Sequence, residues 1–371
     1  MLWMVVTPAA VAWQAGTGQA AQDAAGEETP VAVFHAYTNL IQVPVLVLNS
    51  DHKPLPPIAE KKFAVSLDGG PAFTPTHVRA EGEDPITLSI LLDVGGDDAQ
   101  LMPQVEKALN GLTPALLHPR DRVSVYLLGC SLQRFADDAP AGGALYQAAA
   151  ENAVKAWKEQ PKVGRGCRQT THLWDSLGYM IKQMSSLPGR RVILAMTDGH
   201  DRGSAHTWNQ IRVFGAATSV AIFGLTPRGW GGVGIHDELV DRAYSQVDAP
   251  YPFAKPAMED AGRGDQFELM CELTGGLVLT ARVGEVDREM RRFVEMVRGR
   301  YIVEFPRSDE ATAGAHSFVV TVGNQAAFVR ASGKSVPLPD PEELADPSTQ
   351  AKDPAKAPKF GTRKVVPPFP Q

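Results

Sequence analysis

The chain has 371 residues, enough for about two or three structural units, and with 44% hydrophobic and 21% charged residues its composition is that of a globular protein. A formal net charge of −6 without a dominant basic patch argues against a nucleic-acid or anionic-membrane partner, because binding to phosphates needs clustered Lys and Arg. Beyond the N-terminal residues no stretch is apolar over the roughly 20 residues of a membrane-spanning helix, so no membrane span is expected in the mature chain.

The first 22 residues carry no charge, are mostly apolar up to Trp13, and continue into small residues. This pattern is typical of the apolar region and cleavage site of a secretory signal, although the basic segment that usually precedes them is missing. We expect a signal peptide over residues 1–21, a linker over residues 22–33, and a secreted or periplasmic protein. A frayed N-terminus is the alternative.

The next predicted elements are β-strands. Two β-rich runs at 40–48 and 63–67 are separated by turn residues, and Asp-Gly-Gly at 68–70 is a typical hairpin turn. We expect an N-terminal β segment over residues 34–82.

From residue 83 to residue 300, apolar strands alternate with amphipathic helices. Strands are predicted at residues 86–92, 122–128, 192–196 and 219–224, and helices at 102–112, 173–184, 208–214, 267–273 and 290–297. This alternation predicts an α/β fold with a doubly wound, mostly parallel sheet and helices on both faces.

After residue 300 the chain returns to β structure. Runs at 301–305 and 318–322 predict a C-terminal β-hairpin within residues 301–334. The Pro- and Lys-rich residues 335–371 predict a disordered tail.

Two predicted strands end in acidic turns. Asp93 ends the first strand and precedes Val-Gly-Gly-Asp, and the strand at 192–196 runs into Thr-Asp-Gly-His-Asp at 197–201. Ligands of α/β proteins bind at the carboxyl ends of the strands. The two turns share one site only if their strands are parallel neighbours.

The order of these motifs resembles a von Willebrand factor type A (VWA) domain. The matching stretches are the strand ending in Asp93, Thr-Thr-His-Leu-Trp-Asp at 170–175, Met-Thr-Asp-Gly-His-Asp at 196–201 and Leu-Met-Cys-Glu-Leu-Thr-Gly-Gly at 269–276. The flanking β segments resemble those of VWA-related domains common in exported acidobacterial proteins. The resemblance implies a VWA-like domain over residues 83–300 with a metal-ion-dependent adhesion site at the carboxyl ends of its strands.

In that family an Asp-x-Ser-x-Ser loop, a threonine and a second aspartate hold a divalent cation, and an acidic group of the partner completes its coordination. The resemblance assigns Asp93, Thr171 and Asp198 to the aspartate, threonine and second aspartate, whereas Gly95 and Asp97 stand in place of the serines. The implied metal ligands are therefore Asp93, Asp97, Thr171 and Asp198, in a degenerate site for Mg²⁺ or another divalent cation.

Loss of both serines changes what this site can hold. Gly95 removes one ligand, and Asp97 adds a negative charge that makes a bound metal a poorer receptor for an acidic partner. Two alternatives stay open: a cation held by the remaining ligands, or a cation-free site whose carboxylates take up protons or pair with the guanidinium of Arg165 or Arg168.

The resemblance implies a binding protein whose partner is a protein or a surface polymer. We expect the partner to bind to loops at the carboxyl ends of the strands, those around Gly95, Asp97, Thr171, His200 and Asp201. Asp175 is expected in the first turn of a helix, where the helix dipole favours it, rather than at a metal.

The chain contains no Gly-x-Ser-x-Gly elbow, no phosphate loop and no His-Glu-x-x-His motif, so an enzyme is not expected. A structural or assembly subunit is the main alternative to a binding protein, and a hydrolase that uses the acidic cluster is a second one. The oligomeric state is left open.

The three cysteines are Cys130, Cys167 and Cys271. In an exported chain a Cys130–Cys167 disulfide is conceivable, because both residues are predicted in loops at one edge of the sheet. Buried free thiols are the alternative, above all for Cys271, which falls in a helical pattern.

Overall fold

The computed structural model describes residues 40–95, 100–159, 172–201, 203–227, 263–306, 318–323, 326, 328–332, 359 and 361. The chain divides into a unit of Met1–Tyr37, which lies outside the described residues, and a unit of Thr38–Gln371, to which everything below belongs. The predicted signal peptide and linker therefore lie outside the described residues.

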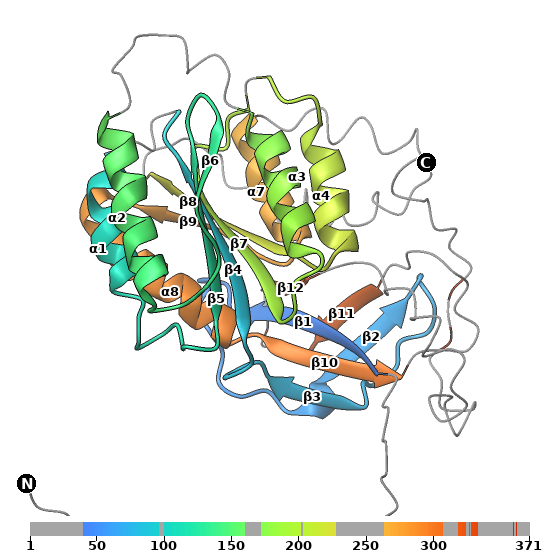
Figure 1. The fold of residues 1–371 in the computed structure, drawn as a ribbon. Coiled ribbons are helices and arrows are strands. Elements are labelled where there is room, and N and C mark those ends of the chain that lie inside the picture. Colours follow the sequence, from blue (N-terminus) through green and yellow to red (C-terminus); the bar gives the residue numbers. More distant parts are fainter. Residues whose placement is uncertain are drawn as a thin grey trace, which may run out of the picture. The chain divides into compact units, whose positions relative to one another are not determined.

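The second unit is built around a six-stranded sheet with strand order β6-β5-β4-β7-β8-β9 (Figure 1). Its strands are β4 (Ile86–Asp93), β5 (Arg122–Leu128), β6 (Leu132–Pro140), β7 (Arg190–Met196), β8 (Ala221–Pro227) and β9 (Val278–Ala281). All neighbours are parallel except the edge strand β6, which is antiparallel to β5. The predicted doubly wound, mostly parallel sheet is confirmed.

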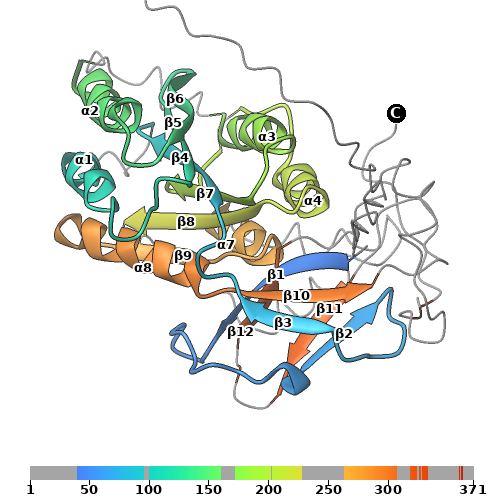
Figure 2. The ribbon, with the colours of Figure 1, turned by 60° about the horizontal axis from the view of Figure 1, so that its bottom comes forward.

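Helices cover both faces of this sheet (Figures 1 and 2). One face carries α1 (Met102–Asn110), α2 (Ala144–Glu159) and α8 (Val286–Arg298), and the other carries α3 (Leu173–Met184), α4 (Trp208–Ala217) and α7 (Arg263–Leu273). Because successive side chains of a strand point to opposite faces, Leu88 and Ile90 pack into the first core and Leu91 into the second. No helix among the described residues is long and apolar enough to cross a bilayer.

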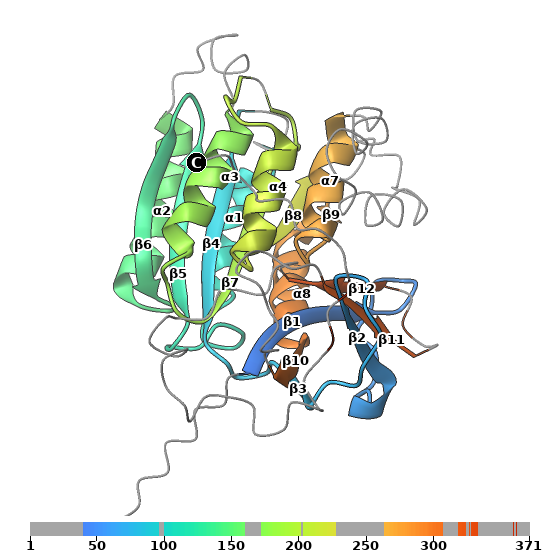
Figure 3. The same cartoon turned by 90° about the vertical axis from the view of Figure 1, so that its right-hand side faces the viewer.

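The segments before and after the α/β domain fold together into one β module, which lies below the central sheet in Figure 3. Its strands are β1 (Leu40–Leu48), β2 (Phe63–Leu67), β3 (His77–Ala80), β10 (Tyr301–Pro306), β11 (Phe318–Val322) and β12 (Phe328–Ala331). Short 3-10 turns at Glu60–Lys62 and Val283–Glu285 precede β2 and α8. The four-stranded sheet has the order β12-β1-β10-β3, and β11 and β2 form a separate pair.

The predicted hairpin within residues 301–334 is wrong. Strand β10 pairs antiparallel with β1 on one side and β3 on the other, and β11 pairs with β2. The two N-terminal partners leave β10 no free edge for β11. Alternate side chains of both segments, including Val45, Val65, Val303 and Phe305, fill one core between the sheets. The described strands within residues 34–82 and 301–334 therefore form one module rather than two flanking segments, because together they bury a core.

The turn after β2 has the predicted hairpin geometry. Asp68 and Gly69 have positive φ angles of 48° and 71°, as a type I′ turn requires, and Gly70 N–H donates to Leu67 O at 2.7 Å. Gly361 N–H also donates to Leu67 O, at 3.0 Å. Apart from Lys359 and Gly361, the tail over residues 335–371 that is predicted to be disordered lies outside the described residues.

Apolar and ionic contacts join the β module to the α/β domain. Leu46, Leu48 and Phe328 belong to the same apolar cluster as α1, α2 and α8. Arg330 of β12 donates two hydrogen bonds to Oε2 of Glu272 in α7, at 3.1 and 2.8 Å, with each side chain only 10% exposed. Such a desolvated pair is costly to break, because the remaining charge is left in the interior.

The module contacts the amino ends of the central strands. Arg190, the first residue of β7, donates to Oε1 of Gln42 at 3.1 Å and pairs with Asp84 at 3.3 Å. Arg298, at the end of α8, donates to the carbonyl oxygen of Asp84 at 2.9 Å and to Asp121. The described contacts of the β module therefore lie at the end of the sheet opposite the acidic strand ends.

Candidate functional site

The strand order places a topological switch point between β4 and β7. These strands are parallel neighbours, yet the chain leaves β4 toward α1 on one face and leaves β7 toward α4 on the other. Connections that diverge in this way open a crevice at the carboxyl ends of the two strands, where doubly wound proteins bind ligands. The condition for a site shared by the two acidic turns is met.

Asp93 ends β4 in this crevice and is 1% exposed. The register pairs Leu92 with Met196, so the next residues, Asp93 and Thr197, lie side by side. Thr197 Oγ1 donates to Asp93 Oδ2 at 2.8 Å, and Gly95 N–H donates to Asp93 Oδ1 at 2.8 Å. The buried carboxylate thereby joins the loop after β4 to the loop after β7, and its desolvation is offset by bonds from these donors.

Asp198 organises the second loop in a similar way. Its side chain is 5% exposed, and its Oδ1 accepts the N–H of His200 at 2.9 Å. The Nδ1 atom of His200 lies 3.4 Å from the same oxygen. Thr197 Oγ1 also accepts the N–H of Gly199 at 3.1 Å. The Thr-Asp-Gly-His sequence thus forms a turn held by its own side chains.

Two of the four metal ligands implied by the resemblance, Asp97 and Thr171, lie outside the described residues, as do Arg165 and Arg168. Among the residues that the structure describes, no group of three or more His, Cys, Asp and Glu side chains is arranged to hold a metal ion. Asp93 and Asp198 supply hard oxygen atoms of the kind that Mg²⁺ and Ca²⁺ prefer. Two carboxylates already bonded to protein donors do not by themselves fit a metal centre.

The loop after β7 is tied to the start of α3. Asp201 Oδ1 accepts the N–H of Trp174 at 3.2 Å and the hydroxyl of Ser204 at 2.5 Å. Asp201, expected in a partner-binding loop, therefore also acts as a cap of α3, because its carboxylate bonds to the open N–H groups of the first turn. The helix begins at Leu173, with His172 at the N-cap position and no capping bond from the His172 side chain.

Asp175 lies in the first turn of α3, as predicted, and bonds back to the same loop. Its carboxylate accepts the N–H groups of Ala205 at 2.9 Å and His206 at 3.0 Å, and the His206 ring lies 2.7 Å away. Partial burial alone would raise the pKa of Asp175, but these N–H groups and the His206 ring hold it below its usual value. Asp175 therefore fixes the loop to the helix.

The sequence reasoning missed two residues of this network, Thr197 and Ser204. Thr197 was visible as the residue before Asp198, but its partner follows only from the register of β4 against β7. Ser204 Oγ accepts the N–H of Asp175 at 3.1 Å and donates to Asp201. No local pattern distinguishes such a serine from an ordinary loop residue.

The structure separates the cysteines into two kinds. Cys130, in the turn between β5 and β6, is disulfide-bonded. Cys271, in α7, is a free thiol that is fully buried, and burial raises its pKa well above the usual value. Cys167, the remaining cysteine, lies outside the described residues.

No protein-family model matches the chain, and no curated protein matches it. Among solved structures it is similar to proximal thread matrix protein 1 from the mussel byssus, at 13% identity and a TM-score of 0.36 over 59% of this chain and 50% of that one. It is similar to the pilus adhesin SpaC from Lactobacillus rhamnosus GG, at 9% identity and a TM-score of 0.38 over 74% of this chain and 47% of that one.

A third similar structure is the conserved hypothetical protein BatB from Bacteroides thetaiotaomicron, at 10% identity and a TM-score of 0.36 over 57% of this chain and 98% of that one. The chain spans about half the length of the first structures that it matches.

Proposed function

We propose that this chain is an exported VWA-like binding protein that holds a protein or surface-polymer partner on the loops at the carboxyl ends of β4 and β7. The observation that carries the proposal is the bond from Thr197 Oγ1 to Asp93 Oδ2 at the switch point of the sheet. Two carboxylates, Asp93 and Asp198, are buried there, at a sheet end that the described contacts of the β module leave open.

The loop after β7 is built as a rigid platform. The carboxylates of Asp175 and Asp201 bind it to the first turn of α3, while Ala205 and His206 of the loop are exposed. A loop that is ordered before binding avoids the entropic cost of ordering on contact with the partner. A loop that a stable scaffold holds in one conformation is therefore suited to form a binding surface.

In this proposal the adhesion site is degenerate, and the carboxylates serve mainly to position the loops. The matched experiment restores the serines. In the double variant Gly95→Ser, Asp97→Ser, millimolar Mg²⁺ should raise the melting temperature, whereas the wild-type protein should show a smaller rise. A ligand at 100 times its Kd adds about 2.7 kcal/mol of stability, so the difference is measurable. Equal rises in both proteins would contradict a degenerate wild-type site.

The partner surface is tested by adding bulk to the platform without breaking its bonds. Ala205 is exposed and bonds to Asp175 only through its backbone N–H, so Ala205→Arg should leave the fold intact and block the face. The control is Ala148→Arg, at an exposed position near the start of α2, at the opposite end of the sheet.

Both variants and the wild type are used to capture partners from the envelope fraction, with and without chelator. The proposal predicts one partner that is retained by the wild type and by Ala148→Arg but lost by Ala205→Arg. Retention by all three would favour an assembly subunit that makes its contacts elsewhere. Turnover of a phosphate or ester substrate that Asp93→Asn abolishes would favour a hydrolase instead.

A further inference from the structure

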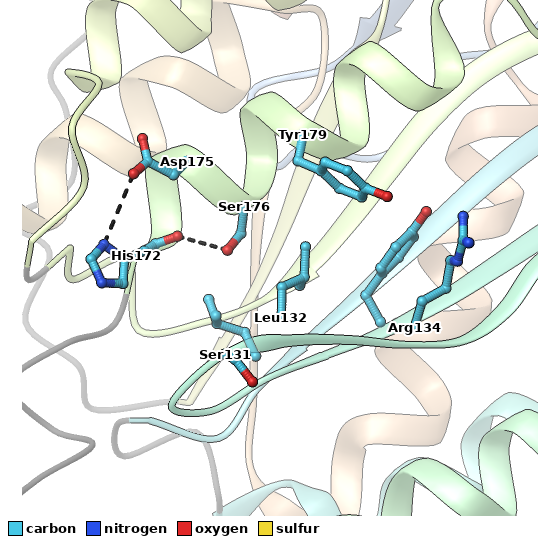
Figure 4. A pocket seen from close by; sticks show the side chains of 9 residues that line it. Ser131, Leu132, Arg134, His172, Asp175, Ser176 and Tyr179 are labelled. Atoms are coloured by element: carbon cyan, nitrogen blue, oxygen red, sulfur yellow. Dashed lines mark hydrogen bonds and ion pairs between the residues drawn. The ribbon is translucent and has the colours of Figure 1, made fainter.

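A cavity of about 400 Å³ lies between the β5–β6 hairpin and α3, a size typical of small-ligand sites (Figure 4). The pairing of the hairpin places Arg134 opposite Tyr126 and Leu132 opposite Leu128. Because alternate residues of a strand share a face, all four side chains point toward α3. Tyr179 of α3 lies across from them, so the cavity has an apolar floor with polar groups at both ends, and Arg134 and the two tyrosines lie at one of these ends.

Three hydrogen-bond donors meet at that end. The rings of Tyr126 and Tyr179 are edge to face with their centres 6.4 Å apart, and Arg134 pairs with Tyr126 across the hairpin. Burial, together with the nearby charge of Asp137, raises the pKa of Tyr126, so its phenol stays protonated and can donate. The group that complements three donors is an acceptor, and an anionic acceptor forms the strongest bonds.

Arg134 is only partly committed to a partner within the protein. It pairs with Asp137 at 2.7 Å, but the two side chains are 43% and 54% exposed. An ion pair in water contributes little, so a carboxylate inside the cavity can compete for the guanidinium. The planar guanidinium offers donors in the fork geometry that a carboxylate accepts.

At the other end, the polar side chains of α3 are already bonded within the protein. Asp175 accepts the N–H groups of Ala205 and His206, and Ser176 Oγ donates to the carbonyl oxygen of His172 at 2.7 Å. The dashed lines of Figure 4 mark the Ser176 bond and the His172–Asp175 pair, at 3.9 Å. We therefore expect the charged group of a ligand to bind at the Arg134 end of the cavity.

We propose that this cavity binds a carboxylate that is attached to an aromatic or branched aliphatic group. The carboxylate bonds to Arg134 and the two phenols, and the apolar group lies against Leu128 and Leu132. Two sources have this chemistry: a free arylalkanoic acid and the C-terminal residue of a peptide. The site is separate from Asp93 and does not depend on the function proposed above.

The test uses N-acetylphenylalanine and its C-terminal amide as matched probes, with binding followed by NMR shifts of the tyrosine and leucine signals. The acid should bind at least about tenfold more tightly than the amide, because a charge-assisted bond is stronger than a neutral one. An acetylated tetrapeptide ending in phenylalanine separates the sources: if it binds as well as the acid, the ligand is a peptide C-terminus, and if it does not, it is a free acid.

Four variants locate the bond. Arg134→Gln should weaken binding of the acid about tenfold or more and make acid and amide equal, and Tyr179→Phe should weaken it severalfold. Asp137→Asn should strengthen binding, because it removes the competing carboxylate. Lys107→Gln, which removes one charge from an exposed position of α1, on the opposite face of the sheet, should change nothing. Equal binding of acid and amide by the wild type, full binding by Arg134→Gln, or no saturation up to about 10 mM would each overturn the proposal.

Discussion

The bond between Thr197 and Asp93 is the contact on which the two acidic loops depend, and Thr197→Val removes it without changing the shape of the side chain. The variant loses the donor to Asp93 Oδ2, at 2.8 Å, and the acceptor of the Gly199 N–H, at 3.1 Å. Both bonds are buried, since Thr197 is 0% exposed and Asp93 1% exposed. A buried group that loses its partner bears the full cost of desolvation.

The expected loss of stability can be worked from these two bonds. A hydrogen bond to a charged group contributes about 1.5–3 kcal/mol and a neutral one about 0.5–1.5 kcal/mol, so Thr197→Val should cost about 2–4 kcal/mol. For a domain of this size that corresponds to a fall in melting temperature of roughly 5–10 °C. The measurement is urea and thermal unfolding in buffer with chelator, so that no bound cation adds to the stability.

The matched control is Thr226→Val, also a buried threonine near the end of a central strand. Among the described residues its hydroxyl makes one long bond, to the carbonyl oxygen of Leu279 at 3.5 Å, so its loss should cost about 1 kcal/mol or less. A double-mutant cycle of Thr197→Val with Asp93→Ala, which removes the acceptor, isolates the pair and should give a coupling of about 1.5–3 kcal/mol. A Thr197→Val cost no larger than that of the control, or a coupling near zero, would refute the reasoning.

Three further predictions concern the covalent link, acid stability and the junction with the β module. Peptide mapping without reduction should find the peptides of Cys130 and Cys167 linked by a disulfide. Because that bond closes a loop of about 40 residues, its reduction should lower the free energy of unfolding by about 4 kcal/mol. The pKa of Asp175 is depressed in the folded protein, so its ionised carboxylate contributes to stability. That contribution is complete above the unfolded pKa of about 4 and is lost as the pH falls through the folded pKa. The difference in unfolding free energy between wild type and Asp175→Asn should therefore disappear in acid, and a difference that stays constant with pH would contradict this. Arg330→Met should cost about 3–5 kcal/mol, because it leaves the Glu272 carboxylate buried without its guanidinium, and adding Glu272→Leu should restore much of that loss; an additive double variant would show that the pair is not coupled.

The central sheet could be predicted because its strands are marked locally. A strand buried on both faces, such as β4, reads as a continuous apolar run, and the helices between such strands force parallel pairing. Polar and apolar residues are mixed in the edge strand β6, and most of the buried residues of α2 are alanines, such as Ala149 and Ala153. Alanine offers little apolar area, so the helical spacing in α2 is a weaker signal than the bulky side chains that marked the other helices.

Strand pairing in the β module could not be predicted for a different reason. The β-rich runs of β10 and β11 indicate two strands, and their being consecutive in the sequence favours a hairpin. The partners that they have, β1, β3 and β2, lie more than 200 residues earlier in the sequence. A strand's own pattern shows which face is buried but not which strand lies beside it.

The candidate site shows the same limit at the level of single atoms. A motif read from sequence compares side chains, and at residue 95 it records the loss of a serine hydroxyl. The described contribution of Gly95 to this site is its backbone N–H, which donates to Asp93 at 2.8 Å and is present whatever the side chain. The second donor to Asp93 is the hydroxyl of Thr197, on the neighbouring strand. The described bonds that position Asp93 do not involve the side chain of residue 95, so the absence of a serine there weakens the case for a cation and leaves the position of Asp93 unchanged.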